Sequence, residues 1–289
     1  METLSDLLNI LELEKIKENS FVGQNYITPW RIIFGGQVLG QSLHAAYATV
    51  PEDRFVHSLH GYFILPGNVD IPVEYEVDIT RDGGSFTTRR VQARQKNKTI
   101  FVAAISFQVR QEGLEHQIYM PNVVSPEILM TDLEQLQDIK DSHPMLYQRL
   151  SRLHPNPIEF RPVEQVFTRE MKKLAPFRHV WMKSKELLEA DPRVHHQVLA
   201  FASDYNLLGT ALLPHRETLS DQNYFIASLD HAMWFHRDFD INEWLLFAMD
   251  SPSASNSRAL TRGNIFSREG KLVVSLAQEG LIRIFRNEA

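Results

Sequence analysis

The sequence predicts an α+β protein made of two fused copies of one unit, in which an antiparallel sheet wraps round a long helix. Three observations predict this arrangement. A helical stretch precedes several strand-like runs, short turns join those runs, and the same series recurs later in the chain. With 289 residues, of which 43% are hydrophobic, the chain is long enough for two ordinary domains and a sizeable buried core.

The first copy follows a short leading segment that we expect to be an amphipathic helix. Apolar residues recur there at roughly helical spacing, namely Leu4, Leu7, Leu8, Leu11 and Ile16. A longer helix opens near Gln37, and four strands are then expected over Val56–Leu65, Val73–Arg81, Phe86–Gln95 and Ile100–Val109. The turns at 81–84 and 96–98 are short, so these strands are expected to pair as antiparallel hairpins.

The second copy repeats short sequence pieces of the first in the same order. The corresponding pieces are 37–39 with 197–199, 58–59 with 228–229, 71–74 with 241–244, Arg90 with Arg258, and Gln108 with Gln278. Between the copies lies a stretch rich in proline and charge, with two short helices expected over 127–141 and 145–153. We therefore divide the chain into a first unit (1–118), a linker (119–163) and a second unit (164–289).

Composition excludes several classes of function. The formal net charge is −6 and no basic stripe stands out, which argues against a nucleic-acid partner. The chain has no cysteine, so disulfides, a cysteine nucleophile and thiolate metal sites are excluded. No metal and no cofactor are expected, because zinc-binding and dinucleotide-binding motifs are absent. With no secretory signal and no run long enough to cross a membrane, we expect a cytoplasmic protein.

The chain resembles the acyl-CoA thioesterase II family in segments spread over nearly its whole length. In the family's order these are FGGQVLGQSLHAAYATVP, VHSLHGYFILPG, RDGGSFTTRRVQARQ, FVAAISFQ, FASDYN, LDHAMWFHR, EWLLF and AQEG. The resemblance implies a double hotdog fold and hydrolysis of acyl-CoA thioesters to free fatty acid and CoA. We expect substrates of medium to long chain, although the sequence does not give the chain length. The resemblance also implies a catalytic trio of Asp204, Ser228 and Gln278. Position 228 departs from the family's commoner threonine, which keeps the hydroxyl but loosens control of its rotamer.

Each of these three residues also has a structural, non-catalytic explanation when it is considered alone. Asp204 borders the apolar face of a helix expected over 193–213, where a carboxylate needs hydrogen-bond donors, a function, or a turn towards solvent. Ser228 lies at the start of an apolar strand, where a serine is commonly a satisfied hydroxyl. Gln278 ends the last long strand and recurs as Gln108, which suits a structural amide equally well. In the first copy, His44 stands where the second has Asp204, so only one working site is expected.

If the trio converges, thioester hydrolysis by water is the expected chemistry. Asp204 would accept a proton from the water while Ser228 and Gln278 hold it in line, and burial would raise the carboxyl pKa. Gly35 and Gly36 open the first helix, either to present N–H groups to an oxyanion or to let the helix pack closely. Arg90 and Arg258 are candidates for binding CoA phosphates. Asp230 and His231 are neighbours on a strand and face opposite sides, so they form no relay with Ser228, and His231 is taken as structural.

Two other functions remain open on the sequence. One is a hotdog hydratase acting on enoyl-CoA, which needs a second proton-transfer group, and the other is a non-catalytic acyl-CoA-binding protein. The two fused units are expected to pair their sheets edge to edge, and further association into a homodimer or tetramer is expected. The sequence identifies neither the lining of the acyl channel nor whether the linker covers the site as a lid.

Overall fold

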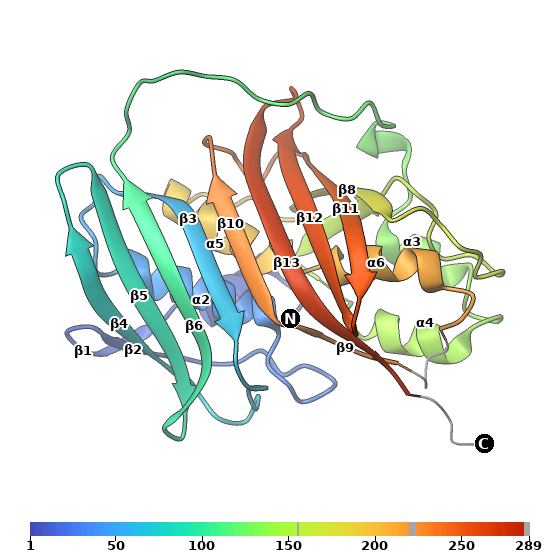
Figure 1. The fold of residues 1–289 in the computed structure, drawn as a ribbon, viewed down its shortest axis with the longest axis horizontal. Helices are drawn as coiled ribbons and strands as arrows, with labels where there is room; N and C mark the ends of the chain where they lie inside the picture. The colour runs from blue at the N-terminus through green and yellow to red at the C-terminus, as the bar shows by residue number, and fades with distance from the viewer. Residues whose placement is uncertain (155, 220–223, 286–289) are drawn as a thin grey trace.

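The computed structural model describes residues 1–154, 156–219 and 224–285, and these form one continuous antiparallel sheet with helices on one face (Figure 1). The strand order is β1-β2-β4-β5-β6-β3-β10-β13-β12-β11-β8-β7, and β9 pairs with β13. The predicted α+β class is therefore confirmed. In the described ranges, no helix is long and apolar enough to cross a membrane.

The first unit contains a leading helix, a two-strand edge, a long helix and four strands. Their bounds are α1 Leu4–Leu11, β1 Glu14–Lys17, β2 Ser20–Gly23, α2 Gly35–Tyr47, β3 Phe55–Phe63, β4 Val73–Asp82, β5 Phe86–Gln95 and β6 Lys98–Gln108. The four expected strands are present to within two residues at each end. Lys96 and Asn97 both have positive φ (47° and 63°), as tight hairpin turns require. Ile16 was wrongly placed in the first helix, since it is 55% exposed in β1.

The second unit follows the linker and has an equivalent set of elements. The linker holds η1 Pro126–Ile128, α3 Asp132–Gln137 and α4 Pro144–Ser151. The second unit holds β7 Ile158–Pro162, β8 Phe177–Ser184, α5 Pro192–Ser203, α6 Leu207–Leu212, η2 Leu213–His215, β9 Tyr224–Ser228, β10 Asp230–Phe235, β11 Leu245–Ser255, β12 Arg258–Ser267 and β13 Leu272–Ile284. The linker helix expected over 127–141 is shorter than predicted, because a Thr131 capping box starts α3 only at Asp132.

The sheet is nearly symmetric about the pairing of β3 with β10. From that junction the order is β3-β6-β5-β4-β2 in one direction and β10-β13-β12-β11-β8 in the other. Ser58 pairs with Trp234 and Tyr62 with Asp230 across the junction. The strand order agrees with a repeat, and the boundaries 1–118, 119–163 and 164–289 stay a prediction.

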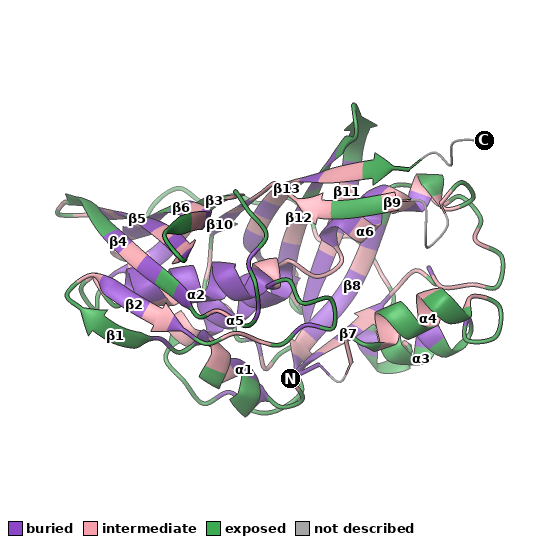
Figure 2. Cartoon of the chain, turned by 90° about the horizontal axis from the view of Figure 1, so that it is seen from below, coloured by how far each residue is buried: buried purple, intermediate pink, exposed green. Residues whose placement is uncertain are grey.

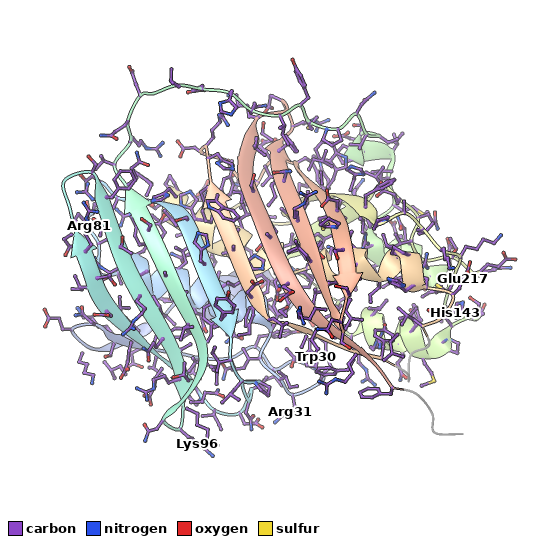
Figure 3. The ribbon with its side chains drawn as sticks, viewed as in Figure 1. Trp30, Arg31, Arg81, Lys96, His143 and Glu217 are labelled. Carbon is purple, nitrogen blue, oxygen red and sulfur yellow. The ribbon has the colours of Figure 1, made fainter. Side chains whose placement is uncertain are left out.

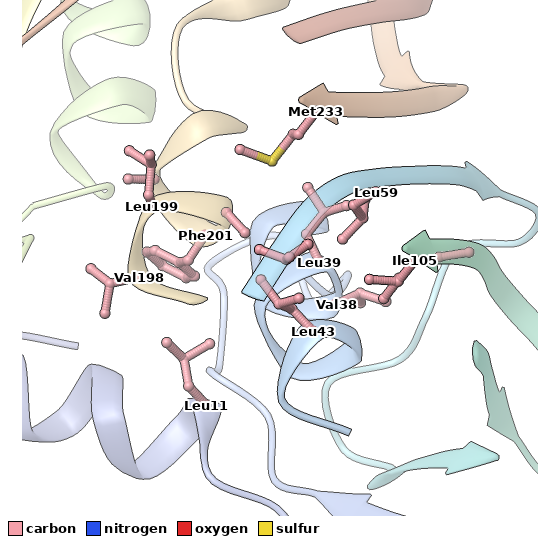
Figure 4. Packing of buried hydrophobic residues seen from close by; sticks show 14 of the residues in the cluster. Leu11, Val38, Leu39, Leu43, Leu59, Ile105, Val198, Leu199, Phe201 and Met233 are labelled. Carbon is pink, nitrogen blue, oxygen red and sulfur yellow. The ribbon is translucent and has the colours of Figure 1, made fainter. Parts of the chain in front are cut away.

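The core is formed where α2 and α5 pack against each other beneath the sheet. Figure 2 shows both helices as largely buried, whereas α4 has no buried residue. Leu39 and Leu43 of α2 and Phe201 of α5 are fully buried in one cluster with sheet residues such as Leu59 (Figure 4). A Cβ added at Gly36 would lie well inside 3.0 Å of the Phe201 carbonyl oxygen. Glycine at this position therefore lets the two helix backbones approach closely.

The linker crosses from one unit to the other and then packs against the second. After β6 it runs along one end of the strands to η1 (Figure 1). There Met120 and Leu129 pack on a small second core, and the Trp181 indole donates to the Val124 carbonyl at 2.9 Å. The linker is thus fastened to the second unit, where α3 also packs on β7.

Candidate active site

Asp204 lies at a break in the helix that the sequence predicted to be continuous. Helix α5 ends at Ser203, Asp204 caps it, and α6 begins only at Leu207. Asn206 between them has φ 72°, in the left-handed region that asparagine tolerates better than most residues. The expected helix over 193–213 was therefore wrong in its middle. Asp204 extends from a helix end and is partly exposed.

Gln278 brings the three predicted residues together. Its Nε2 donates to Asp204 Oδ1 at 2.8 Å and to Ser228 Oγ at 3.0 Å. The strand positions differ slightly from the prediction, since Ser228 ends β9 and Gln278 lies in the middle of β13. The pairing of Ser228 with Gly280 explains how β9 reaches the site. The structure thus places one carboxylate, one hydroxyl and one amide in direct contact.

The Asp204 carboxyl is subject to opposing effects on its pKa. Burial raises the pKa above its ordinary value, whereas hydrogen bonds from Gln278, from the Gly36 N–H and from Ser228 lower it. The net direction is upward. A carboxyl whose pKa is raised binds a proton more readily, which suits a group that accepts a proton from water.

A buried histidine, His231, contacts the side-chain amide of Gln278. His231 Nδ1 lies 3.3 Å from Gln278 Nε2, and His231 Nε2 lies 3.0 Å from Ser203 Oγ. Ser203 donates its own proton to the Ala200 carbonyl at 2.9 Å, so it must accept from His231 Nε2–H. This leaves Nδ1 as an acceptor, which can only share one of the two Gln278 Nε2 protons in a longer three-centre contact, because these protons already point to Asp204 and Ser228. Burial lowers the His231 pKa to about 3, so the ring is neutral at physiological pH.

The sequence analysis took His231 as structural and passed over Ser203. Both nitrogens of His231 are satisfied, as expected, but one of them contacts Gln278. The side chains of β10 alternate between buried and less buried positions, and His231 is fully buried. A histidine on the inward face of an apolar strand beside Ser228 was the signal available.

Asp230 faces away and accepts from the Glu279 N–H at 2.6 Å, so no Asp–His relay forms.

The two glycines of the first unit lie directly against Asp204. The Gly36 N–H donates to Asp204 Oδ2 at 3.0 Å. A Cβ at Gly35 would lie 2.7 Å from the same oxygen. The close-packing alternative for this pair therefore has support, whereas the Gly36 N–H is bound to Asp204 and its role towards a substrate oxyanion stays a prediction. The site is shared between the units, because α2 supplies a donor to a carboxylate on α5.

The two candidate phosphate-binding arginines lie elsewhere. Arg90 pairs with Asp78 at 3.4 Å, and Arg258 pairs with Glu279 at 2.9 Å. Glu279 neighbours Gln278 on β13, where successive side chains face opposite sides of the sheet. Arg258 is thus on the face away from Asp204. Neither arginine contacts the trio, so their proposed role gains no support from the geometry.

A cavity of about 880 Å³ opens beside the trio, between the linker helices and α6. Tyr205 and Asn206, which directly follow Asp204, line it together with Ile226 of β9. Figure 3 labels His143 and Glu217 at its outer flank, one from the linker and one beyond α6. The remaining apolar lining is Leu136, Met145, Leu146, Leu150, Leu153, Phe160, Val166, Phe167, Met171, Leu212, Leu213 and Leu219. The linker therefore forms one wall of the cavity. Among the described residues, no cluster of histidines and acids is arranged to hold a metal ion.

Known proteins resemble this chain over nearly its whole length. The family model for acyl-CoA thioesterase matches residues 155–281, and that for the acyl-CoA thioesterase N-terminal domain matches 26–108. Human acyl-coenzyme A thioesterase 8 is 41% identical over 95% of this chain and 88% of its own length. Acyl-CoA thioesterase 2 of Haemophilus influenzae is 37% identical over 98% of both chains.

Solved structures agree with these relatives. An acyl-CoA thioesterase II from Mycobacterium marinum superposes with a TM-score of 0.78 at 38% identity, covering 96% of this chain and 97% of that one. A hotdog-fold protein from Alicyclobacillus acidocaldarius has a TM-score of 0.75 at 18% identity, covering 95% and 97%, and supports the fold alone. The double hotdog fold is thereby confirmed, and the two family models, the relatives and the solved structures together show that the chain belongs to the acyl-CoA thioesterase II family.

Proposed function

We propose that this protein hydrolyses acyl-CoA thioesters of medium to long chain to free fatty acid and CoA, with Asp204 activating water. The observation that carries this proposal is the Asp204 carboxyl, which is partly exposed, has a raised pKa and is anchored by Gln278 Nε2 and Gly36 N–H. A base that is anchored at both oxygens keeps a fixed direction towards its proton donor, which favours reaction. The family membership supports the same reaction.

The proposed reaction has two steps. Water attacks the thioester carbonyl carbon while Asp204 accepts one of its protons, which gives a tetrahedral oxyanion. The oxyanion collapses, the carbon–sulfur bond breaks, and the CoA thiolate takes the proton from Asp204. The products are one free acid and one CoA thiol, and no group of the protein is consumed.

Ser228 and Gln278 have different parts in this scheme. Ser228 is partly exposed and can contact the water, whereas Gln278 is 1% exposed and acts through Asp204 and Ser228. Gln278 Oε1 is buried without a hydrogen-bond partner in the described chain, an arrangement that costs about 1–3 kcal/mol. We assign the oxyanion to N–H groups at the start of α2 other than that of Gly36, which binds Asp204, because a helix N-terminus favours negative charge.

The cavity beside Tyr205 is the proposed acyl site. It is near the upper end of the volume range usual for sites that bind small molecules, and much of its lining is aliphatic or aromatic. A medium or long chain would replace water against these side chains, with each buried methylene contributing about 0.8 kcal/mol. The linker wall supplied by α4 would then contribute to chain-length preference.

A ladder of saturated acyl-CoAs, assayed with a thiol reagent, tests the proposed function. The protein has no cysteine, so its own thiols add no background. CoA release should peak at a medium or long chain, and Asp204→Asn should lower kcat by about 10²–10⁴-fold. Asp78→Asn is the matched control, because this exposed carboxylate pairs with Arg90 away from the site.

Two results would contradict the assignment. Release that persists in Asp204→Asn would keep the reaction but remove Asp204 as the base. No release from any chain length by the unmodified protein would reject hydrolysis, and hydration of crotonyl-CoA would then support a hydratase. Binding of acyl-CoA without either reaction would support a binding protein.

We also propose that the protein associates into dimers or tetramers. Large apolar side chains remain exposed on two neighbouring loops, with Trp30 at 43%, Ile64 at 52% and Leu65 at 46% exposure. The bridge between Ile32 and Asn68 brings these loops together. Light scattering during gel filtration should give a mass of two or four chains, and a monomer at micromolar concentration would contradict the proposal.

A further inference from the structure

The first unit supplies an aromatic side chain to the surroundings of Asp204. Phe63 is the last residue of β3 and is partly buried. A Cβ built on Gly35 would lie 2.9 Å from Phe63 Cζ and 2.7 Å from Asp204 Oδ2. The ring and the carboxylate oxygen therefore border the same small space, on the bare side of Gly35. This contact joins the first unit to Asp204 at a second point, besides the Gly36 N–H.

The Phe63 ring is supported on its other side by a second aromatic ring. Phe63 pairs with Phe101 of β6, and their ring centroids lie 5.0 Å apart. Phe101 is fully buried, and Gly61 makes room for it, because a Cβ at Gly61 would lie well inside 3.0 Å of the Phe101 ring. Packed aromatic rings have few torsions left to vary. Phe63 therefore keeps the far edge of its ring, formed by Cζ and Cε1, against Gly35.

The backbone of Phe63 is tied to the corner that presents Ser228. Its N–H donates to the Leu229 carbonyl at 2.9 Å, and the Leu229 N–H donates to the Glu279 carbonyl at 2.9 Å. Leu229 directly follows Ser228 in the chain. In the same way, Glu279 directly follows Gln278. Because these are backbone bonds, a change of the Phe63 ring alone leaves both strands in place.

An aromatic edge beside a carboxylate has a defined physical effect. The ring edge carries a slight positive charge, so it tolerates the anion, but it cannot donate the hydrogen bond that a water molecule would. Asp204 Oδ2 already accepts from the Gly36 N–H, and Oδ1 accepts from Gln278 Nε2. A ring in place of water on the Gly35 side therefore favours the protonated carboxyl, which is the direction in which burial shifts the Asp204 pKa.

The groups that face Asp204 carry no formal charge in the ranges that the structure describes. Burial and three hydrogen bonds alone shift its pKa. Burial also raises the pKa of Tyr205 and lowers that of His231, so both side chains are neutral at physiological pH. Asp230 and Glu279, on the adjacent strands, face the other side of the sheet. Access of water to the carboxyl is therefore the property through which a neighbouring ring can act.

We propose that Phe63 is a positioning residue for the reaction, because its ring closes the Gly35 side of the Asp204 carboxyl to solvent. Water then reaches the carboxyl only from the side where Ser228 lies, which gives the attacking water one direction of approach. The inference rests on the proposed hydrolysis at Asp204. It gives the first unit a second part in the site, since the ring and the Gly36 N–H both come from that unit.

Two substitutions of the ring test this inference on the acyl-CoA that the protein cleaves fastest. Phe63→Ala admits water beside Gly35, so kcat on the plateau of the pH profile should fall by about 10-fold while KM changes little. The acid limb of kcat/KM should move to lower pH, because a solvated carboxyl has a lower pKa. Phe63→Leu keeps apolar bulk, so both quantities should stay near those of the unmodified protein. Phe86→Ala, on an exposed phenylalanine that contacts His57 instead, is the matched control.

Each other result overturns the inference. A lower kcat with an unmoved acid limb would mean that the ring only stabilises the fold. A limb that moves to higher pH would mean that the ring preserves the hydrogen bonds to Asp204 rather than excluding water. Equal changes in Phe63→Leu and Phe63→Ala, or no change in either, would show that apolar bulk at this position is unimportant. Phe63→Val, which also stops short of Gly35, provides the same comparison if Phe63→Ala does not fold.

A titration without substrate separates this inference from the proposed hydrolysis. Carboxyl ¹³C NMR of protein labelled at aspartate reports the Asp204 pKa directly, and Asp204→Asn identifies its resonance. A lower Asp204 pKa in Phe63→Ala than in the unmodified protein, with no change in Phe86→Ala, supports the role of the ring even if no thioester is cleaved. An unchanged Asp204 pKa in Phe63→Ala rejects that role even if Asp204 proves to be the base.

Discussion

The protonation state of the Asp204 carboxyl group determines how the candidate site can work. Asp204 accepts hydrogen bonds from Gln278, Gly36 and Ser228, yet burial outweighs them and raises its pKa. The charged form is therefore less favourable in the folded protein than in the unfolded chain. Functional residues often lower the stability of the folded state in this way.

Two measurements should show this conflict at Asp204. Because the base must be unprotonated, kcat/KM should fall on the acid side at a pH above the ordinary aspartate range of about 4. A folded pKa above the unfolded one adds stability at low pH, and this contribution is lost as pH rises through the folded pKa. Asp204→Asn should therefore melt at a higher temperature than the unmodified protein at pH 7, with activity lost. An unchanged or lower melting temperature, or an acid limb near pH 4, would contradict this.

His231 should act as a positioning residue through Gln278. Replacement by leucine removes the acceptor that faces Gln278 Nε2, so the amide should hold Asp204 less firmly. This predicts a kcat lowered by about 10-fold or more with KM little changed, on the scale of one lost buried hydrogen bond. Weakening a bond that lowers the Asp204 pKa should also move the acid limb of the pH profile to higher pH. A purely structural role would lower stability without moving that limb. His236→Leu, an exposed histidine bonded to Ser275, is the control.

At the scale of elements, the site depends on how two helices meet. Helix α2 approaches α5 so closely that Gly36 has no room for a side chain beside the Phe201 carbonyl oxygen. The same approach brings the Gly36 N–H to Asp204. The break after Ser203 turns the chain through Asn206 in the left-handed region, and this frees the Asp204 carboxyl to meet that N–H. Helix packing and site geometry therefore share the same residues.

Gly36→Ala should therefore damage stability and activity together. The added methyl group meets backbone rather than a flexible side chain, so the helices must separate, at a cost of about 1–3 kcal/mol. Separation lengthens the bond to Asp204, and kcat should fall as well. Thermal melting and CoA release would measure both effects. Gly84→Ala is the control, because a Cβ there meets nothing within 4 Å. Equal behaviour of the two variants would show that the close approach is unimportant.

At the scale of the whole molecule, the two units form one structure. The sheet is continuous through β3 and β10, and one core cluster includes residues from both units. The trio lies entirely in the second unit, but its anchoring N–H at Gly36 comes from the first. Neither unit contains a complete site.

A divided chain should therefore lose function until its parts reassemble. The fragment 119–289 alone should release no CoA, although it contains Asp204, Ser228 and Gln278, because α5 lacks its partner helix. Coexpression with 1–118 should restore release and a single cooperative melting transition. Circular dichroism and the thiol assay would measure both. Activity in the isolated fragment would show that the first unit is not needed for the site.

Local patterns in the sequence determined the elements of the fold. Hairpin turns such as Lys96–Asn97, strand alternation and the repeated short pieces depend on neighbouring residues, so the strands and the α+β class could be predicted. The choice of Asp204, Ser228 and Gln278 came from family resemblance. Their contact in the structure could not be read from spacing, because Asp204 and Gln278 are 74 residues apart.

Other features were decided only by the tertiary structure. The helix breaks at Asn206 although the apolar residues keep a helical spacing through this position. Helical periodicity cannot detect the break, because a single left-handed residue leaves the pattern intact on both sides. The roles of Gly36 and His231 depend on contacts with distant elements. The sequence by itself determined the repeated strands and helices, since these follow from local hydrogen bonding and side-chain periodicity. The tertiary structure decided the direction of the Asp204 carboxyl and the hydrogen bonds that hold it, since these arise only when residues far apart in sequence are packed together.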